Sequence, residues 1–254
     1  MNPWLGSGDV STALNKIITF LPVYFYLIGQ LPKTLLINPF SFYGRATIRA
    51  IVSLLGWKNP CDQIKNLAPT QPLGELVPPQ AVRILHPPAY LGDVSTYELV
   101  VLNSLVKAFK PRNVFEIGTL HGRTTVNLLE NAEQLEVLHT LDILEVLPAN
   151  KFSSHPRVAK VKRIVADSRK LDVGPYARKM DFIFIDADHR YDAVVSDSRK
   201  AMEMLSSGGC LVWHDYTMMP DTKQACHEFM QQHPGRLFVQ IEDTTLLVML
   251  PAGR

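Results

Sequence analysis

NVFEIGTLHG, residues 113–122, is an apolar, strand-like run that ends in a glycine-containing turn. Helical spacing of apolar residues follows over 122–132. A strand that turns through glycines into a helix is a typical unit of an open α/β sheet, in which ligands bind at the carboxyl ends of the strands. Glycine also lets the backbone approach a ligand closely. We therefore expect the turn from Glu116 to Gly122 to form the floor of a cofactor site, although such a turn is often only a turn.

Strand-like and helical patterns alternate beyond this turn. The strand-like runs are LEVLHTLDI (135–143), VKRIVAD (161–167), DFIFIDAD (181–188) and CLVWHDY (210–216), with helical patterns over 191–206 and about 221–232. This alternation predicts an α/β fold with a doubly wound, mostly parallel sheet and helices on both faces. The last stretch, RLFVQIEDTTLLVML (236–250), has two strand-like runs and no helix between them, which predicts a C-terminal antiparallel hairpin.

The region before the first strand divides into two parts. Ser95 and Glu98 fit a capping box, and the apolar residues that follow predict a helix that ends at Lys110-Pro111. Residues 1–92 contain many prolines and no repeated strand-then-helix pattern. We expect an N-terminal accessory region with a Pro-rich linker over 1–92 and one catalytic domain over 93–254.

Composition narrows the class of partner. The 254 residues carry a formal net charge of +2, and the basic residues are scattered without an aromatic-interleaved run. This pattern argues against nucleic-acid binding and favours a small-molecule partner. Cys61, Cys210 and Cys226 are odd in number and lack metal-site spacing, so free thiols in a reducing, cytoplasmic compartment are expected.

Ile17 to Gly29 (IITFLPVYFYLIG) is almost wholly apolar. A transmembrane helix needs about 20 apolar residues, so this segment is too short to span a bilayer. It does not fit a signal peptide, because Asp9 precedes it and no small-residue cleavage site follows. Three uses remain open, which are packing on the catalytic domain, pairing with another subunit in a homo-oligomer, and contact with a membrane surface.

Polar residues follow two of the predicted strands at the expected ligand edge. Asp142 closes one strand about two dozen positions after Gly118, where a carboxylate can accept hydrogen bonds from ribose hydroxyls. A helix N-cap is its alternative role. Asp167 and Ser168 close the next strand, where an adenine edge could lie, and capping of the following segment is again the alternative.

Acids and imidazoles gather at the ends of the two strands that follow. Asp186, Asp188 and His189 come directly after the apolar run FIFI, and His214-Asp215 ends the next strand. Asp186, His214 and Asp215 could bind a divalent cation, or either histidine could serve as a general base. The alternative is a solvated loop in which Asp188 caps the next helix and the histidines are structural.

Taken together, these segments resemble the class I S-adenosylmethionine-dependent methyltransferases. They are most similar to the branch with an F-I-D-x-x-H-x-Y segment and a later G-G-x-x-x-x-H-D segment, which includes small-molecule O-methyltransferases. The resemblance covers about Ser95 to Leu250 and implies a Rossmann-like fold. The matching segments, in order, are FEIGTLHGRTT, TLDI, ADS, DFIFIDADHRYDAVVSD and SGGCLVWHDY.

The resemblance implies roles for the matching residues. Asp142 would hold the ribose of S-adenosylmethionine, Asp167 with Ser168 would meet the adenine, and Asp186 would face the sulfonium and the substrate. The residues that would form the methionine side of the cofactor site are Glu116, Gly118, Thr119 and Gly122.

The resemblance leaves the need for a metal open. In metal-dependent relatives such as catechol O-methyltransferase, acids at the ends of the fourth and fifth strands bind magnesium. Asp186 matches the first of these, but His214 stands where a carboxylate is expected, with Asp215 beside it. The expected catalytic set is Asp186, His189, His214 and Asp215, and the expected metal set is Asp186, His214 and Asp215.

The implied reaction is direct transfer of a methyl group to a substrate oxygen, in which the enzyme supplies alignment and removes the hydroxyl proton. Two other functions compete with it. A nicotinamide-dependent oxidoreductase would share the fold, but its G-x-G-x-x-G motif is absent. A catalytically inactive cofactor-binding or scaffold protein would keep both the fold and the cofactor site.

Overall fold

An eight-stranded sheet organises the residues that the computed structural model describes, which are 60–86, 93–145 and 151–253. The strand order is β1-β7-β8-β6-β5-β2-β3-β4. Every neighbouring pair is parallel except the two pairs that involve β8, which runs against β6 and β7. The strands are β1 (Thr70–Gln71), β2 (Asn113–Ile117), β3 (Val137–Asp142), β4 (Val161–Val165), β5 (Met180–Ile185), β6 (Leu205–Trp213), β7 (Phe238–Ile241) and β8 (Leu247–Met249).

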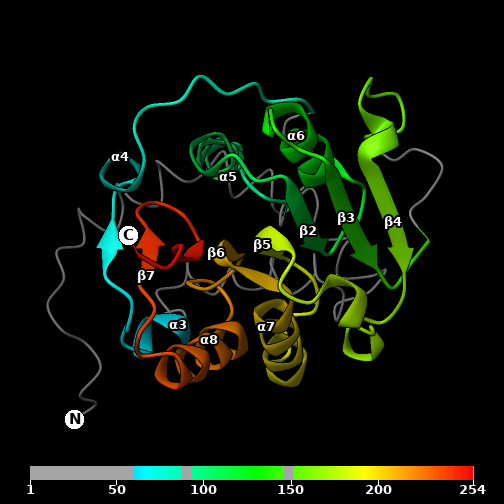
Figure 1. Cartoon of the computed structure of the whole chain (residues 1–254). Coiled ribbons are helices and arrows are strands. Elements are labelled where there is room, and N and C mark those ends of the chain that lie inside the picture. Colours follow the sequence, from blue (N-terminus) through cyan, green and yellow to red (C-terminus); the bar gives the residue numbers. More distant parts are fainter. Residues whose placement is uncertain (1–59, 87–92, 146–150, 254) are drawn as a thin grey trace, which may run out of the picture. The chain divides into compact units, whose positions relative to one another are not determined.

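Helices cover both faces of this sheet (Figure 1). On one face lie α5 (Thr96–Phe109) and α6 (Arg123–Asn131), and on the other lie α7 (Tyr191–Met204) and α8 (Pro220–Gln232). Each face has its own cluster of buried apolar side chains. The shorter helices are α3 (Pro60–Gln63), α4 (Leu73–Leu76), η1 (Val158–Lys160), η2 (Ser168–Lys170) and η3 (Gly174–Tyr176).

The predicted doubly wound sheet and its C-terminal hairpin are confirmed. The central strands read as nearly continuous apolar runs because helices bury them on both faces, as in β5, where Phe182 to Ile185 are all buried. The hairpin is the β7–β8 pair, in which Val239 lies opposite Val248. Its second strand is the reversed one of the sheet.

The capping box at the start of α5 is also confirmed. Ser95 Oγ accepts a hydrogen bond from the Glu98 backbone N–H at 3.2 Å, and Glu98 Oε2 accepts one from the Ser95 N–H at 2.9 Å. At the other end, Lys110 adopts a left-handed conformation with φ 50°, and Pro111 follows it. The helix therefore ends where the sequence predicts, because proline cannot continue it.

The segment before α5 contributes more than an irregular linker. Thr70–Gln71 forms β1, which pairs in parallel with β7 and extends the sheet. Further along, the Asn127 side chain accepts from the Leu85 backbone N–H and donates to the Leu85 carbonyl. The Asn131 side chain makes the same two hydrogen bonds with the backbone of Arg83. The division of the chain at residue 92 stays a prediction.

A second difference concerns Ser207 to Gly209, which lie between the helix predicted over 191–206 and the strand predicted over 210–216. These residues belong to β6, which follows α7 without a loop. The register of β6 against β5 shifts between Met180 and Phe182. A side chain at Gly209 would come within 2.6 Å of Leu205 Cδ1, so glycine permits this irregular start of the strand.

The apolar segment from Ile17 to Gly29 lies outside the described residues. Within residues 60–86, 93–145 and 151–253, none of the helices combines the length and apolar character needed to cross a bilayer.

Candidate active site

The turn between β2 and α6 packs against the end of β5. The Asp186 backbone N–H donates to the Ile117 carbonyl at 2.8 Å, and a Cβ on Gly118, which has φ 105°, would overlap the Asp186 carbonyl. Gly122 has φ 72°, and a Cβ there would overlap the Phe152 ring. Contacts within the protein therefore explain both glycines. Their predicted role in admitting a ligand stays a prediction.

Asp142 ties this turn to the end of β3. Its Oδ2 accepts from the backbone N–H groups of Thr119 at 3.1 Å and Leu120 at 2.7 Å, and its Oδ1 accepts from Leu144 at 3.0 Å. Leu120, Ile143 and Leu144 are 54%, 63% and 68% exposed around this carboxylate. Exposed apolar side chains beside an oriented acceptor suit a ligand that has both hydroxyl donors and a flat apolar face.

Glu116 lies fully buried beneath the same turn. Its Oε2 accepts from the hydroxyls of Thr125 and Thr140, and its Oε1 has no hydrogen-bond partner among the described residues. Burial raises the pKa of this carboxyl to about 8, although the two hydroxyl donors oppose the shift. Glu116 is therefore mostly protonated at neutral pH and adds little negative charge to the site.

Asp167 and Ser168 reach the same edge of the sheet, after β4. Asp167 caps η2 by accepting from the Arg169 N–H at 3.0 Å, and its carboxylate also pairs with the Arg169 guanidinium. This pairing lowers the pKa of Asp167. The capping role weighed for Asp167 from the sequence is thus present, and its adenine role stays a prediction.

The acids and imidazoles expected at the ends of β5 and β6 do meet. Asp186 Oδ1 lies 3.1 Å from His214 Nδ1, and Asp215 Oδ2 lies 3.6 Å from the same nitrogen. His189 Nε2 lies 2.8 Å from Asp215 Oδ2 and 3.9 Å from Asp186 Oδ1. We call these four residues the acid–imidazole cluster.

His214 is enclosed by carboxylates. Its Nε2 lies 3.3 Å from Glu98 Oε2, on the side of the ring opposite the Asp186 contact, and its side chain is only 5% exposed. Burial lowers the pKa of His214, but Asp186 and Asp215 outweigh burial and hold the pKa well above 6.5. These contacts favour the charged form of the ring, in which both N–H groups point at carboxylates.

His189 has a different environment within the cluster. Its side chain is 23% exposed, more than that of His214. Burial lowers the pKa of His189, but contact with Asp215 and Asp186 more than offsets this and raises it. Asp186, His189 and Asp215 also place one ligand atom each within 4.8 Å of the others, a spacing that could hold a metal ion. This group contains His189, whereas the metal set expected from the sequence contains His214, and that set stays a prediction.

Asp188, which the sequence also placed near this cluster, is engaged elsewhere. Its Oδ1 accepts from the Arg190 N–H at 3.0 Å, and its carboxylate pairs with the Arg190 guanidinium. The pairing with Arg190 lowers the pKa of Asp188.

Glu98 and Thr245 are site residues that the sequence analysis missed. Glu98 Oε1 accepts from the backbone N–H and the hydroxyl of Thr245 at 2.8 and 2.7 Å. Burial raises the pKa of Glu98, but these donors and His214 lower it to about 2. The capping-box pattern located Glu98 but gave no signal for a contact with a residue 116 positions away.

Comparisons with known proteins agree with this geometry. Residues 115–216 match the family model described as a methyltransferase domain. No curated protein sequence matches the chain. Among solved structures, the O-methyltransferase TomG from Streptomyces achromogenes, involved in tomaymycin synthesis and bound to SAM, is 16% identical with a TM-score of 0.54, over 63% of this chain and 82% of that chain.

An O-methyltransferase from Bacillus cereus, solved in complex with SAH, is 20% identical with a TM-score of 0.50, over 63% of this chain and 84% of that chain. At these identities the likeness establishes the fold. It places the sheet described above, with its reversed strand, among the Rossmann-like folds of such enzymes.

Proposed function

We propose that this chain transfers the methyl group of S-adenosylmethionine to a hydroxyl oxygen of a small molecule, because residues 115–216 match the family model of a methyltransferase domain. One observation carries the proposal: the β2–α6 turn that Asp142 holds and the acid–imidazole cluster lie at the same edge of the sheet. The surroundings of Asp142 suit a nucleoside, and the cluster suits removal of a proton from a substrate beside it. The O-methyltransferase neighbours support oxygen as the acceptor atom.

The described residues fit the cofactor by chemistry. The Asp142 carboxylate can accept from ribose hydroxyls, and the exposed side chains of Ile143 and Leu144 can cover an adenine face. Asp186 is the member of the cluster whose backbone contacts the β2–α6 turn, and its carboxylate can stabilise a sulfonium there. When bound, S-adenosylmethionine supplies an electrophilic methyl group.

Within the cluster, His189 is the proposed general base and Asp215 its positioning partner. The Asp215 contact orients the His189 ring, and His189 takes the hydroxyl proton as the new carbon–oxygen bond forms and the carbon–sulfur bond breaks. His214 lies between Asp186 and Glu98 and holds the Asp186 carboxylate in place.

In a second version of the proposal, the same site holds a divalent cation. Asp186, His189 and Asp215 offer two carboxylates and one imidazole, a donor set that magnesium or a transition metal accepts. A cation held there would make a bound hydroxyl more acidic. His214 would stay outside the ligand set, because both of its ring nitrogens face carboxylates.

The test combines cofactor binding with turnover. Calorimetry should show binding of S-adenosylmethionine and not of nicotinamide cofactors, and a screen of hydroxylated metabolites should release S-adenosylhomocysteine. His189→Gln and Asp215→Asn should lower turnover by about 10²-fold or more, with cofactor affinity kept. The matched control is His227→Gln, on α8, whose ring bonds the Tyr216 hydroxyl.

Each other outcome has a defined meaning. Cofactor binding without turnover on any hydroxylated acceptor would favour the scaffold alternative, and binding of a nicotinamide cofactor instead would favour the oxidoreductase. Loss of activity in a chelator, restored by one added metal, would select the cation version over the histidine base.

A further inference from the structure

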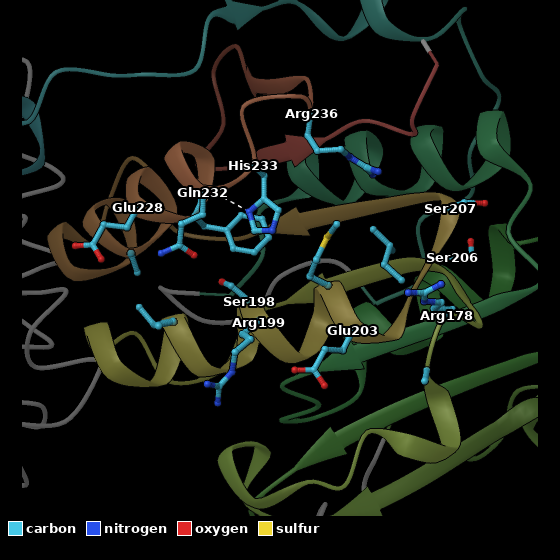
Figure 2. A pocket seen from close by; sticks show the side chains of 16 residues that line it. Arg178, Ser198, Arg199, Glu203, Ser206, Ser207, Glu228, Gln232, His233 and Arg236 are labelled. Atoms are coloured by element: carbon cyan, nitrogen blue, oxygen red, sulfur yellow. Dashed lines mark hydrogen bonds between the residues drawn. The ribbon is translucent and has the colours of Figure 1, made fainter.

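A groove with a volume of about 870 Å³ runs between α7 and α8, on one face of the sheet (Figure 2). It reaches the first residues of β6, at Leu205 to Ser207. The acid–imidazole cluster lies at the opposite, carboxyl ends of β5 and β6, so the groove is separate from the proposed active site. Its volume is within the range of small-molecule sites.

The groove gathers arginines that have no acidic partner. No ion pair joins Arg178, Arg199 or Arg236 to a carboxylate of residues 60–86, 93–145 or 151–253. By contrast, the arginines outside the groove that do pair with a carboxylate are Arg83, Arg112, Arg123, Arg169 and Arg190. Unpaired guanidinium groups collected along one groove favour an anion.

Arg178 and Arg236 define one end of this groove. Figure 2 shows them on the same side as Ser206 and Ser207, whereas Glu228 lies at the far end. The Arg236 guanidinium makes only two long contacts of 3.4 Å, to the carbonyls of Gly209 and Leu250, and its buried Nε–H has no hydrogen-bond partner in the described chain. A buried donor without an acceptor is costly, and an oxyanion would satisfy it.

The backbone holds Arg178 at the rim of the groove. Arg178 adopts φ 55°, and its N–H donates to the carbonyl of Glu203 at the end of α7. Its side chain therefore starts from a fixed point beside the groove.

We propose that this groove binds a small amphipathic oxyanion. Its carboxylate or phosphate group would lie between Arg178 and Arg236, and its apolar body would lie along the half-buried and buried side chains of Met202, Leu205 and Phe229. Arginine suits either head group because its planar fork can donate two parallel hydrogen bonds. This site does not depend on the proposed methyltransferase activity.

The test uses octanoate, octyl phosphate and uncharged octanol on the full chain, with and without S-adenosylhomocysteine. Calorimetry measures the affinity, and nuclear magnetic resonance follows the Arg236 Nε–H signal as the local probe. At least one of the two anions should shift that signal and octanol should not, and the stronger of the two identifies the head group. Inorganic phosphate alone tests whether the apolar body contributes.

Arg178→Gln and Arg236→Gln should each weaken binding of the anion by about tenfold or more, because each removes a charge-assisted contact. Arg163→Gln is the matched control, since Arg163 is exposed on the edge strand β4. Equal binding of octanol, equal loss in all three variants, or no shift of the Arg236 signal at millimolar anion would overturn the proposal. None of these outcomes bears on methyl transfer, which the cofactor assays measure separately.

Discussion

At the residue scale, one buried carboxylate joins three distant parts of the chain. Glu98 caps its own helix, accepts two hydrogen bonds from Thr245 and faces the His214 ring. Removal of one member of such a network leaves the others unpaired and buried, which costs more than any single bond contributes. His214 therefore owes its fixed orientation to residues that precede and follow the central sheet in sequence.

Asp142 provides the first residue-scale prediction. Asp142→Ala should weaken S-adenosylmethionine binding by about 1–3 kcal/mol, because charge-assisted hydrogen bonds to the ribose are lost. The change also removes the acceptor of the Thr119 and Leu120 N–H groups, so thermal unfolding must show that the variant is folded. Calorimetry measures the affinity. Asp172→Ala, which removes a similar acceptor for the Gly174 N–H, is the control, and unchanged affinity in folded Asp142→Ala would remove Asp142 from the site.

Glu116 provides a prediction about pH. Its pKa rises from 4.5 to about 8 on folding, so between these values the folded chain holds a proton that the unfolded chain lacks. Stability should therefore fall as pH rises through this window, by about 1.4 kcal/mol per pH unit from this group.

Glu116→Gln should flatten that fall, because an amide does not titrate. Between pH 5 and 8 the free energy of unfolding of the variant should fall by up to about 4 kcal/mol less than that of the parent protein. Urea unfolding at four pH values measures the difference, and contributions from other groups such as His214 cancel in the comparison. Parallel stability curves would show that Glu116 titrates normally in the folded state.

At the element scale, the crossing, where the β2–α6 turn packs against the end of β5, should tolerate added side-chain atoms less than any other point of the sheet. Gly118→Ala adds a Cβ into the Asp186 carbonyl at a positive φ, and should cost more than about 3 kcal/mol or prevent folding. Gly208→Ala is the matched control, because no atom lies within 4 Å of a Cβ there. Chemical unfolding compares the two, and similar losses would contradict the role given to the crossing.

The order of elements could be predicted because periodicity and helix caps are local signals. The strands from β2 to β6, the long helices and the β7–β8 hairpin follow from apolar spacing, and the cluster at the ends of β5 and β6 follows from the rule that parallel strands end at one edge. β1 has two residues and no periodicity, so only its partner β7 makes it a strand. The contact of Glu98 with His214 depends on how α5 packs, and no spacing in the sequence encodes it.

The difference between the two histidines was likewise outside the reach of the sequence. His189 lies four residues after the end of β5 and His214 lies directly after β6, and either fits a base by residue type. The structure separates them by their surroundings, since His214 has carboxylates on both sides of its ring and is 5% exposed, whereas the His189 side chain is 23% exposed.

At the scale of the whole molecule, Ile17 to Gly29 should belong to the protein's own packing or to a subunit contact. About 13 residues cover about 20 Å as a helix, against a hydrocarbon core of about 30 Å. The full chain should stay out of the liposome fraction in a flotation assay. Deletion of residues 1–40 should instead lower the melting temperature or dissociate an oligomer. Robust flotation of the full chain that the deletion abolishes would show membrane-surface binding.

The pairing of β1 with β7 has a consequence for biosynthesis. Thr70 pairs with Gln240, which lies 170 positions later in the chain. At roughly 5–20 residues per second, a ribosome needs about 10–30 s to make that partner. Thr245, which holds Glu98, is made later still. A nascent chain can therefore form β2 to β5 early, but its acid–imidazole cluster gains the support of Thr245 only after the residues of β7 have been made.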